Sequence, residues 1–112
     1  MNQKPVALTL GEPAGVGAEI TLKAWAELRE ELPFFLIADA SLILALAKEY
    51  NVPVVVIAHP NQASAVMKDA LPVLDHPLPG KVVSGIPTRE NALEVVAMIK
   101  RGVELVQSGQ AC

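Results

Sequence analysis

The amino-acid sequence predicts a three-layer α/β fold, in which helices cover both faces of a mostly parallel β-sheet. Two observations support this prediction. Short apolar runs alternate along the chain with segments whose apolar residues recur at helical spacing, as in proteins built from β-α-β units. These runs also lack the regular polar residues of a strand with one face in water, so they suit strands that are covered on both faces.

The first strand and helix are joined by a glycine-rich turn. The apolar run from Val6 to Leu10 predicts the strand, and the segment from Gly11 to Gly17 holds three glycines within seven residues. Glycine lets a backbone turn sharply, adopt positive φ and approach another group closely, because it has no Cβ. We therefore expect a tight turn and then a helix over Val16 to Leu32, which Pro33 ends.

The stretch from residue 34 to residue 57 predicts a strand, a helix and a third strand. Phe34 to Ala38 is continuously apolar, and Asp39 or Ser41 is expected to cap the following helix. That helix reaches Tyr50 and ends at Asn51 and Pro53, before a β-branched strand. The residues expected on the buried face of the first helix are Ile20, Ala24 and Leu28, with Thr21, Trp25 and Leu32 beside them. Those expected on the second helix are Ile43, Leu46, Ala47 and Tyr50. The third strand is Val54 to Ile57.

The last part of the chain predicts two further helices and one strand. Asn61 to Asp69 is expected to form a short helix, Leu71 to Leu74 a strand, and Asp75 to Gly85 a loop within the same domain. A long helix begins at Pro87 or Thr88 and ends at Gly109. Its apolar face contains Ala92, Val95, Val96, Ile99, Val103 and Val106. No domain boundary is predicted within residues 1–112.

Composition excludes several classes of protein. A net charge of −3 with dispersed basic residues leaves no basic patch for nucleic acid or anionic lipid. Charged residues interrupt every apolar run well before the length of about 20 residues that spans a membrane, and the first residues do not resemble a signal peptide. Hydrophobic residues make up 52%, with a mean hydropathy of +0.39, so part of this apolar surface is expected to meet a partner. One cysteine suits a reducing cytoplasm.

The glycine turn is the main candidate for a functional site, because a helix begins there with unpaired N–H groups that favour an anion. It lacks the lysine of a phosphate-binding P-loop and fits the dinucleotide fingerprint only in part, since Ile20 stands where a small residue is needed. The glycine spacing of short-chain dehydrogenases fits, but their Tyr-x-x-x-Lys pair is absent. From spacing alone, the glycines equally suit a purely structural turn.

The longer string Gly-Glu-Pro-Ala-Gly-Val-Gly-x-Glu, from Gly11 to Glu19, resembles the opening of the 4-hydroxythreonine-4-phosphate dehydrogenase family. It is also similar to the opening of isopropylmalate and isocitrate dehydrogenases, whose fold that family shares. Ala18 replaces a proline that is usual in both. The resemblance extends through Ala38-Asp39-Ala40 to the helix that ends at Gly109, and it implies an NAD-dependent, homodimeric, cytoplasmic enzyme of pyridoxal phosphate biosynthesis.

The resemblance also implies where the chemistry lies. The family holds a divalent metal, such as zinc, magnesium or cobalt, with three histidines from a later part of its chain, so no metal ligand and no catalytic residue is assigned here. The cofactor-binding residues implied by the resemblance are Gly11, Glu12, Gly15, Val16 and Gly17, near the nicotinamide. His59 and His76 are expected to be surface or turn residues, and Cys112 a buried, unreactive one. Asp39, 22 residues after Gly17, is expected to cap a helix or else to bind a ribose.

These observations predict the N-terminal portion of a longer dehydrogenase, inactive alone, that oxidises and decarboxylates 4-phosphohydroxy-L-threonine with NAD. Three alternatives stay open. The first is that the whole enzyme acts on a related four-carbon phosphorylated hydroxy acid without the amine. The second is a short-chain dehydrogenase, although the Tyr-x-x-x-Lys pair is absent, and the third is a non-catalytic phosphate-binding or oligomerisation module.

Overall fold

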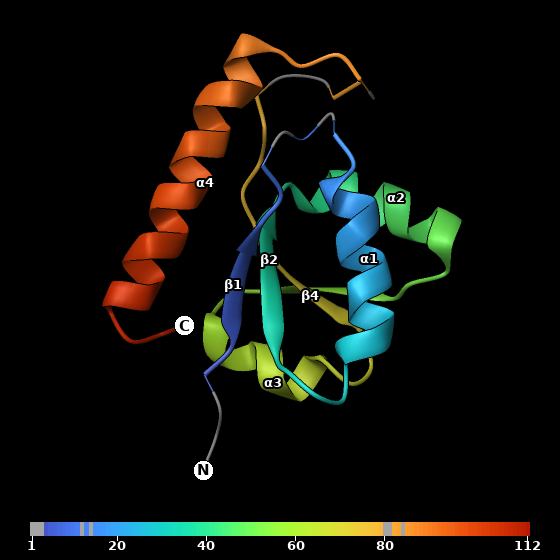
Figure 1. Cartoon of the computed structure of the whole chain (residues 1–112), viewed down its shortest axis with the longest axis vertical. Coiled ribbons are helices and arrows are strands. Elements are labelled where there is room, and N and C mark those ends of the chain that lie inside the picture. The colour runs from blue at the N-terminus through green and yellow to red at the C-terminus, as the bar shows by residue number, and fades with distance from the viewer. Residues whose placement is uncertain (1–3, 12, 14, 80–81, 84) are drawn as a thin grey trace.

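The computed structural model describes residues 4–11, 13, 15–79, 82–83 and 85–112. A four-stranded sheet, in which every pair of neighbouring strands is parallel, lies between helices on both faces (Figure 1). The predicted three-layer α/β fold is therefore confirmed. In chain order the elements are β1 (Val6–Thr9), α1 (Gly17–Leu28), β2 (Phe34–Ala38), α2 (Ala40–Tyr50), β3 (Val54–Ile57), the 3₁₀ turn η1 (Pro60–Gln62), α3 (Ala63–Val66), β4 (Leu71–Asp75) and α4 (Arg89–Gln107).

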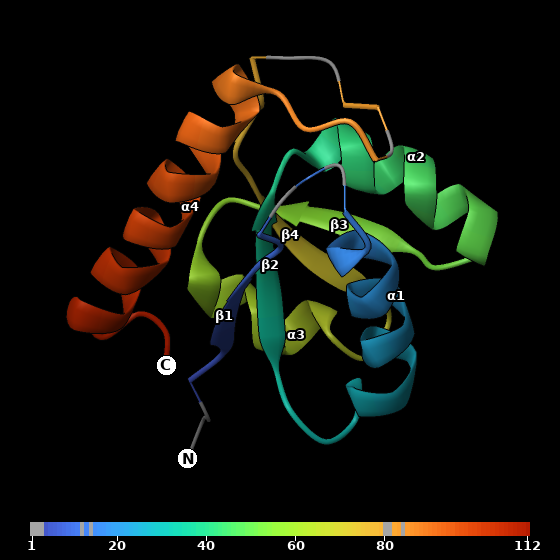
Figure 2. The same cartoon turned by 45° about the horizontal axis from the view of Figure 1, so that its top comes forward.

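The strands lie in the order β1-β2-β4-β3, so the chain crosses the sheet and then returns. The connections through α1 and α2 pass over one face, and the connection from β3 back to β4 passes over the other, with η1 and α3 (Figure 2). α2, which follows β2, packs on the first of these faces, and α4, which follows the neighbouring strand β4, packs on the second. In open α/β sheets, ligands bind beside the carboxyl ends of such a pair of strands.

β2 lies inside the sheet and separates two apolar cores. All five of its residues are buried, as its continuous apolar run predicts. Because side chains alternate along a strand, Phe34, Leu36 and Ala38 pack with α1 and α2, whereas Phe35 and Ile37 pack with α3 and α4. Each helical layer is thus held by its own half of the same strand.

α1 differs from the prediction in its length and in its buried face. It ends at Leu28 rather than Leu32, because the N–H groups of residues 31 and 32 both donate to the Leu28 carbonyl and turn the chain toward the next strand. Ile20, expected to be buried, is 60% exposed. Apolar residues lie on more than one side of this helix, and the side that packs is the one with Thr21 and Trp25, which the prediction places beside the Ile20 stripe. The packed residues are Ala18, Thr21, Leu22 and Trp25.

Two further burial predictions are wrong for the same kind of reason. Tyr50 lies on the last turn of α2 and is 36% exposed. β3 is at the edge of the sheet, next to β4 only, and Val55 and Val56 are 42% and 49% exposed. Whether an apolar run is covered on both faces depends on its place in the sheet, which neighbouring residues do not determine.

The predicted helix ends are confirmed where local chemistry determines them. Asp39 caps α2 with its carboxylate, and Asn51 ends that helix in the left-handed conformation at φ 55°. Thr88 caps α4, because its hydroxyl accepts a hydrogen bond from the Asn91 N–H at 3.3 Å. Gly109 follows α4 at φ 83°, where glycine is favoured.

α4 packs on β1 with one narrow side and leaves its apolar side exposed. Met98 and Gly102 are its buried members next to the sheet. The exposed apolar stripe of α4, as we call it below, consists of Val96, Ile99, Val103 and Val106, which are 64%, 47%, 50% and 46% exposed. The same helix therefore has apolar residues on its packed side and on part of its free side.

Candidate functional site

The glycine turn between β1 and α1 has the geometry that its sequence predicts. Gly11 adopts φ 75°, a conformation that residues with a Cβ rarely adopt, although no atom would obstruct a Cβ there. Gly17 is the first residue of α1, and a Cβ on it would lie 2.6 Å from the Leu10 carbonyl oxygen. The fold therefore favours glycine at both positions, at Gly11 for its φ and at Gly17 for the close approach of helix and strand.

The turn opens on a small cavity of about 210 Å³ between α1, α2 and the loop after β4. Its lining residues are Pro13, Gly15, Ala18, Glu19, Leu42, Leu46 and Val82. Most of the described residues in this lining are apolar, one of them carries a carboxylate and none of them is basic. A phosphate group would be repelled by that carboxylate, whereas a neutral or cationic flat ring would not. Glu12 lies outside the described residues.

Glu19 interacts with a residue from α2. The Tyr50 phenol, on the last turn of α2, interacts electrostatically with the Glu19 carboxylate on the first turn of α1. Loss of hydration raises the pKa of the Tyr50 phenol above its ordinary value of 10.0, and the carboxylates of Glu19 and then Glu49 raise it further. Glu19 also lies in the first turn of α1, where a negative charge is favourable against the helix dipole.

Asp39 follows β2 and uses both carboxylate oxygens to bind backbone. One oxygen accepts from the N–H groups of Ser41 and Leu42 at 3.0 and 3.3 Å, and the other accepts from the Leu78 N–H at 2.9 Å. At the end of β4, Asp75 accepts from the Ala40 N–H at 2.8 Å. The two carboxylates therefore tie together the loops at the carboxyl ends of β2 and β4. The helix-cap prediction for Asp39 is confirmed, and these contacts give no support to a ribose-binding role.

His76 forms a network that the sequence did not reveal. Its Nε2 lies 2.7 Å from the Glu94 carboxylate, and its Nδ1 lies 3.3 Å from the Arg101 guanidinium. Arginine only donates, so Nδ1 accepts and the Nε2–H donates to Glu94. Arg101 also donates to the Asp75 carbonyl at 3.0 Å. These partners are 18 and 25 residues from His76, so the network depends on the docking of α4 and occupies both ring nitrogens.

The other candidate residues lie apart from the glycine turn. His59 is exposed at the start of η1, as expected of a turn residue, whereas His76 is partly buried. Cys112 is exposed rather than buried, because it lies along the outer edge of β1, where its thiol donates to the Lys4 carbonyl at 3.3 Å. In the part of the chain that the structure describes, no three His, Cys, Asp or Glu residues are arranged to hold a metal ion. None of the helices in that part has the length and apolar character needed to cross a membrane.

No protein-family model matches the sequence. Individual enzymes do, over nearly the whole chain. The 4-hydroxythreonine-4-phosphate dehydrogenase of Zymomonas mobilis is 41% identical over 110 residues, which cover 96% of this chain, and that of Caulobacter vibrioides is 42% identical over 109 residues, which cover 97%. The chain spans about a third of the length of these relatives, 32% in both cases.

Solved structures are similar over the same extent. A 4-hydroxythreonine-4-phosphate dehydrogenase from Klebsiella pneumoniae superposes with a TM-score of 0.83 at 26% identity, over 97% of this chain and 35% of that one. The enzyme from Burkholderia phymatum superposes with a TM-score of 0.82 at 26% identity, over 98% and 35%. The resemblance seen in the glycine turn is therefore confirmed along the whole chain. The chain is related to enzymes of the 4-hydroxythreonine-4-phosphate dehydrogenase family over about one third of the length of each enzyme.

Proposed function

We propose that this chain is the N-terminal α/β portion of an NAD-dependent dehydrogenase that oxidises 4-phosphohydroxy-L-threonine, with loss of carbon dioxide, in pyridoxal phosphate biosynthesis. The observation that carries the proposal is the identity of 41–42% with enzymes of this one name over at least 96% of the chain. A chain that spans a third of those enzymes holds only part of their site. We therefore propose that it is inactive alone.

The contribution of this chain to the cofactor site is proposed to be the glycine turn. The residues are Gly11, Glu12, Gly15, Val16 and Gly17. NAD supplies the acceptor for the hydride. The cavity beside Gly15 supports a place near the nicotinamide rather than the pyrophosphate, because the described residues of its lining include the Glu19 carboxylate and no cation. Substitution of Gly11 or Gly17 would also disturb the fold, so Gly15 and the 64% exposed Val16 are the positions where a ligand role can be tested.

The remaining parts of the proposed enzyme come from outside this chain. Its divalent metal, zinc, magnesium or cobalt, is proposed to be bound by histidines elsewhere in the longer protein. We also propose that the enzyme is a cytoplasmic homodimer. Its substrate is a small phosphorylated hydroxy acid, and it binds neither nucleic acid nor a membrane. The dispersed basic residues and net charge of −3 support the last point.

A chimeric enzyme tests the proposal. The matching third of the Zymomonas mobilis dehydrogenase is replaced by this chain, and NADH formation from 4-phosphohydroxy-L-threonine is followed by absorbance. We expect turnover, and we expect Gly15→Val to abolish it by filling the cavity beside the turn. Ala26→Val is the matched control, since it adds the same side chain at an exposed position of α1 and should preserve turnover.

The outcomes of this assay separate the alternatives. A folded chimera without turnover on any substrate would contradict the enzymatic role and favour a phosphate-binding or oligomerisation module. Turnover only of a four-carbon phosphorylated hydroxy acid that lacks the amine would identify the related dehydrogenase. If the Gly15→Val chimera stayed as active as the parent chimera, the glycine turn would not be part of the cofactor site.

A further inference from the structure

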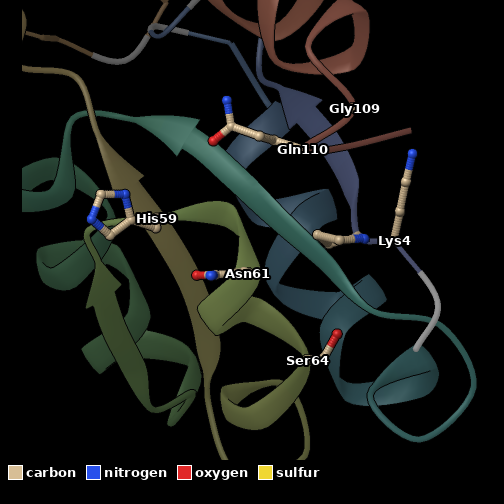
Figure 3. Close-up of a pocket in the computed structure, with 7 residues that line it drawn as sticks. Lys4, His59, Asn61, Ser64, Gly109 and Gln110 are labelled. Carbon is tan, nitrogen blue, oxygen red and sulfur yellow. The ribbon is translucent and has the colours of Figure 1, made fainter. Parts of the chain in front are cut away.

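A second cavity lies far from the glycine turn, on the face of the sheet that carries α3 and α4. It has a volume of about 400 Å³, within the usual range for small-molecule sites. We call it the Lys4 pocket. Its lining residues are Lys4, Pro5, His59, Asn61, Ser64, Gly109 and Gln110 (Figure 3). These residues come from three segments that are distant in sequence, namely the start of β1, the η1–α3 turn and the end of α4.

The described residues that line the Lys4 pocket are rich in hydrogen-bond donors, and none of them carries a carboxylate. Lys4 contributes an ammonium group, which lies 3.6 Å from the position that a Cβ on Gly109 would occupy. Asn61 and Ser64 contribute an amide and a hydroxyl from the facing turn (Figure 3). The chain as a whole has a net charge of −3, so a donor-lined pocket with a cation and no acid differs from the average surface.

Several of these polar groups are available to a ligand. Within the described part of the chain, the side chains of Lys4, Asn61 and Ser64 form no hydrogen bond or ion pair with other residues. Gln110 is positioned by its own contact, because its amide nitrogen donates to the Ser108 hydroxyl at 2.9 Å. The turn that carries Asn61 is also held in place, since the Gln62 side chain accepts from the N–H groups of residues 58 and 59 at 2.7 and 3.0 Å.

We propose that the Lys4 pocket binds the phosphate group of a small organic phosphate. A phosphate monoester offers several acceptor oxygens and a negative charge, which match an ammonium and neutral N–H and O–H donors that line one pocket. Pro5 and the Gly109 backbone leave room for an uncharged organic part next to the phosphate. This site is separate from the glycine turn, so it is independent of the proposed cofactor role.

Amide NMR of the ¹⁵N-labelled chain, titrated with glycerol 3-phosphate, tests the proposal. The signals of Asn61, Ser64, Gly109 and Gln110 should move, and those of residues 15–18 should not. Glycerol is the uncharged control and should move none of them. Inorganic phosphate is the third probe. Equal binding of inorganic phosphate shows that the phosphate group alone is recognised, and tighter binding of glycerol 3-phosphate shows a contribution from the organic part.

Three variants make the test specific. Lys4→Gln should weaken glycerol 3-phosphate binding about tenfold by removing a charge-assisted hydrogen bond. Lys4→Arg should keep it, and Lys23→Gln, which removes an equal charge from an exposed position on α1, should also keep it. The proposal is overturned if glycerol moves the same signals, if Lys4→Gln binds as tightly as the parent chain, or if the shifted signals lie at the glycine turn. These readouts use neither NAD nor turnover, so they do not depend on the dehydrogenase role.

Discussion

Replacing Gly17 by alanine adds one methyl group at the point where α1 meets β1. The new Cβ would lie 2.6 Å from the Leu10 carbonyl oxygen, and the carbonyl carbon and Cα of the same residue would be 3.4 and 3.5 Å away. All three neighbours are backbone atoms, so no flexible side chain can move aside. The strand and the start of the helix must separate to admit the methyl group.

Overpacking of this kind typically costs about 1–3 kcal/mol. Alanine is favoured over glycine inside a helix by up to about 1 kcal/mol, which offsets part of the cost. We therefore expect Gly17→Ala to lower the free energy of unfolding by about 1–2 kcal/mol. At a urea slope of about 2 kcal/mol per M, the unfolding midpoint should fall by roughly 0.5–1 M.

Gly102→Ala is the matched control, because it makes the same chemical change in a helix but is expected to raise the free energy of unfolding. A Cβ on Gly102 would lie 3.6 Å from Ile37 Cδ1 and 3.9 Å from Thr9 Cγ2, which are ordinary contacts with side chains. Only the helix propensity then changes, so this variant should be about 0.5–1 kcal/mol more stable than the parent chain.

The fluorescence of Trp25 offers a direct assay for both variants. It is the single tryptophan of the chain, it is 6% exposed, and its indole N–H donates to the Met67 carbonyl at 2.8 Å. Its emission should therefore change on unfolding in urea. The reasoning is refuted if Gly17→Ala is as stable as the parent chain, or if both variants shift the urea midpoint in the same direction.

Three other predictions follow from the same structure. The chain alone should form no NADH from 4-phosphohydroxy-L-threonine with added zinc or magnesium, and turnover that is lost when either histidine is mutated would contradict this. The exposed stripe of α4 should drive self-association, so sedimentation equilibrium over about a hundredfold range of concentration should show a dimer or larger species that Ile99→Glu and Val103→Glu weaken; a monomeric parent chain at every concentration would refute it. Because the raised pKa of Tyr50 favours its neutral form in the folded state, its contribution to stability is complete below pH 10 and is lost as pH rises through the raised value. Urea midpoints should then fall less between pH 9 and 12 in Tyr50→Phe than in the parent chain, and an equal fall in both would exclude this role.

The sequence by itself determined the features that depend on a few neighbouring residues. The turn at Gly11 follows from the φ that only glycine adopts easily, and the start of α2 follows from the Asp39 carboxylate, which accepts N–H groups two and three residues later. The ends at Asn51 and Gly109 depend equally on local backbone conformation. The resemblance in the glycine turn, likewise a local string of residues, was enough to identify the related enzymes.

Only the tertiary structure decided which apolar surfaces are covered and which polar groups meet. β4 lies between β2 and β3, and this order leaves Val55 exposed at the sheet edge, although its neighbours in sequence are as apolar as those of β2. The contact of His76 with Glu94, and the cavity that Lys4 shares with Ser64, join residues that are 18 and 60 positions apart in the sequence. Such contacts depend on how the helices and strands pack together. The packing results from competition among all their apolar faces, which no short stretch of sequence specifies.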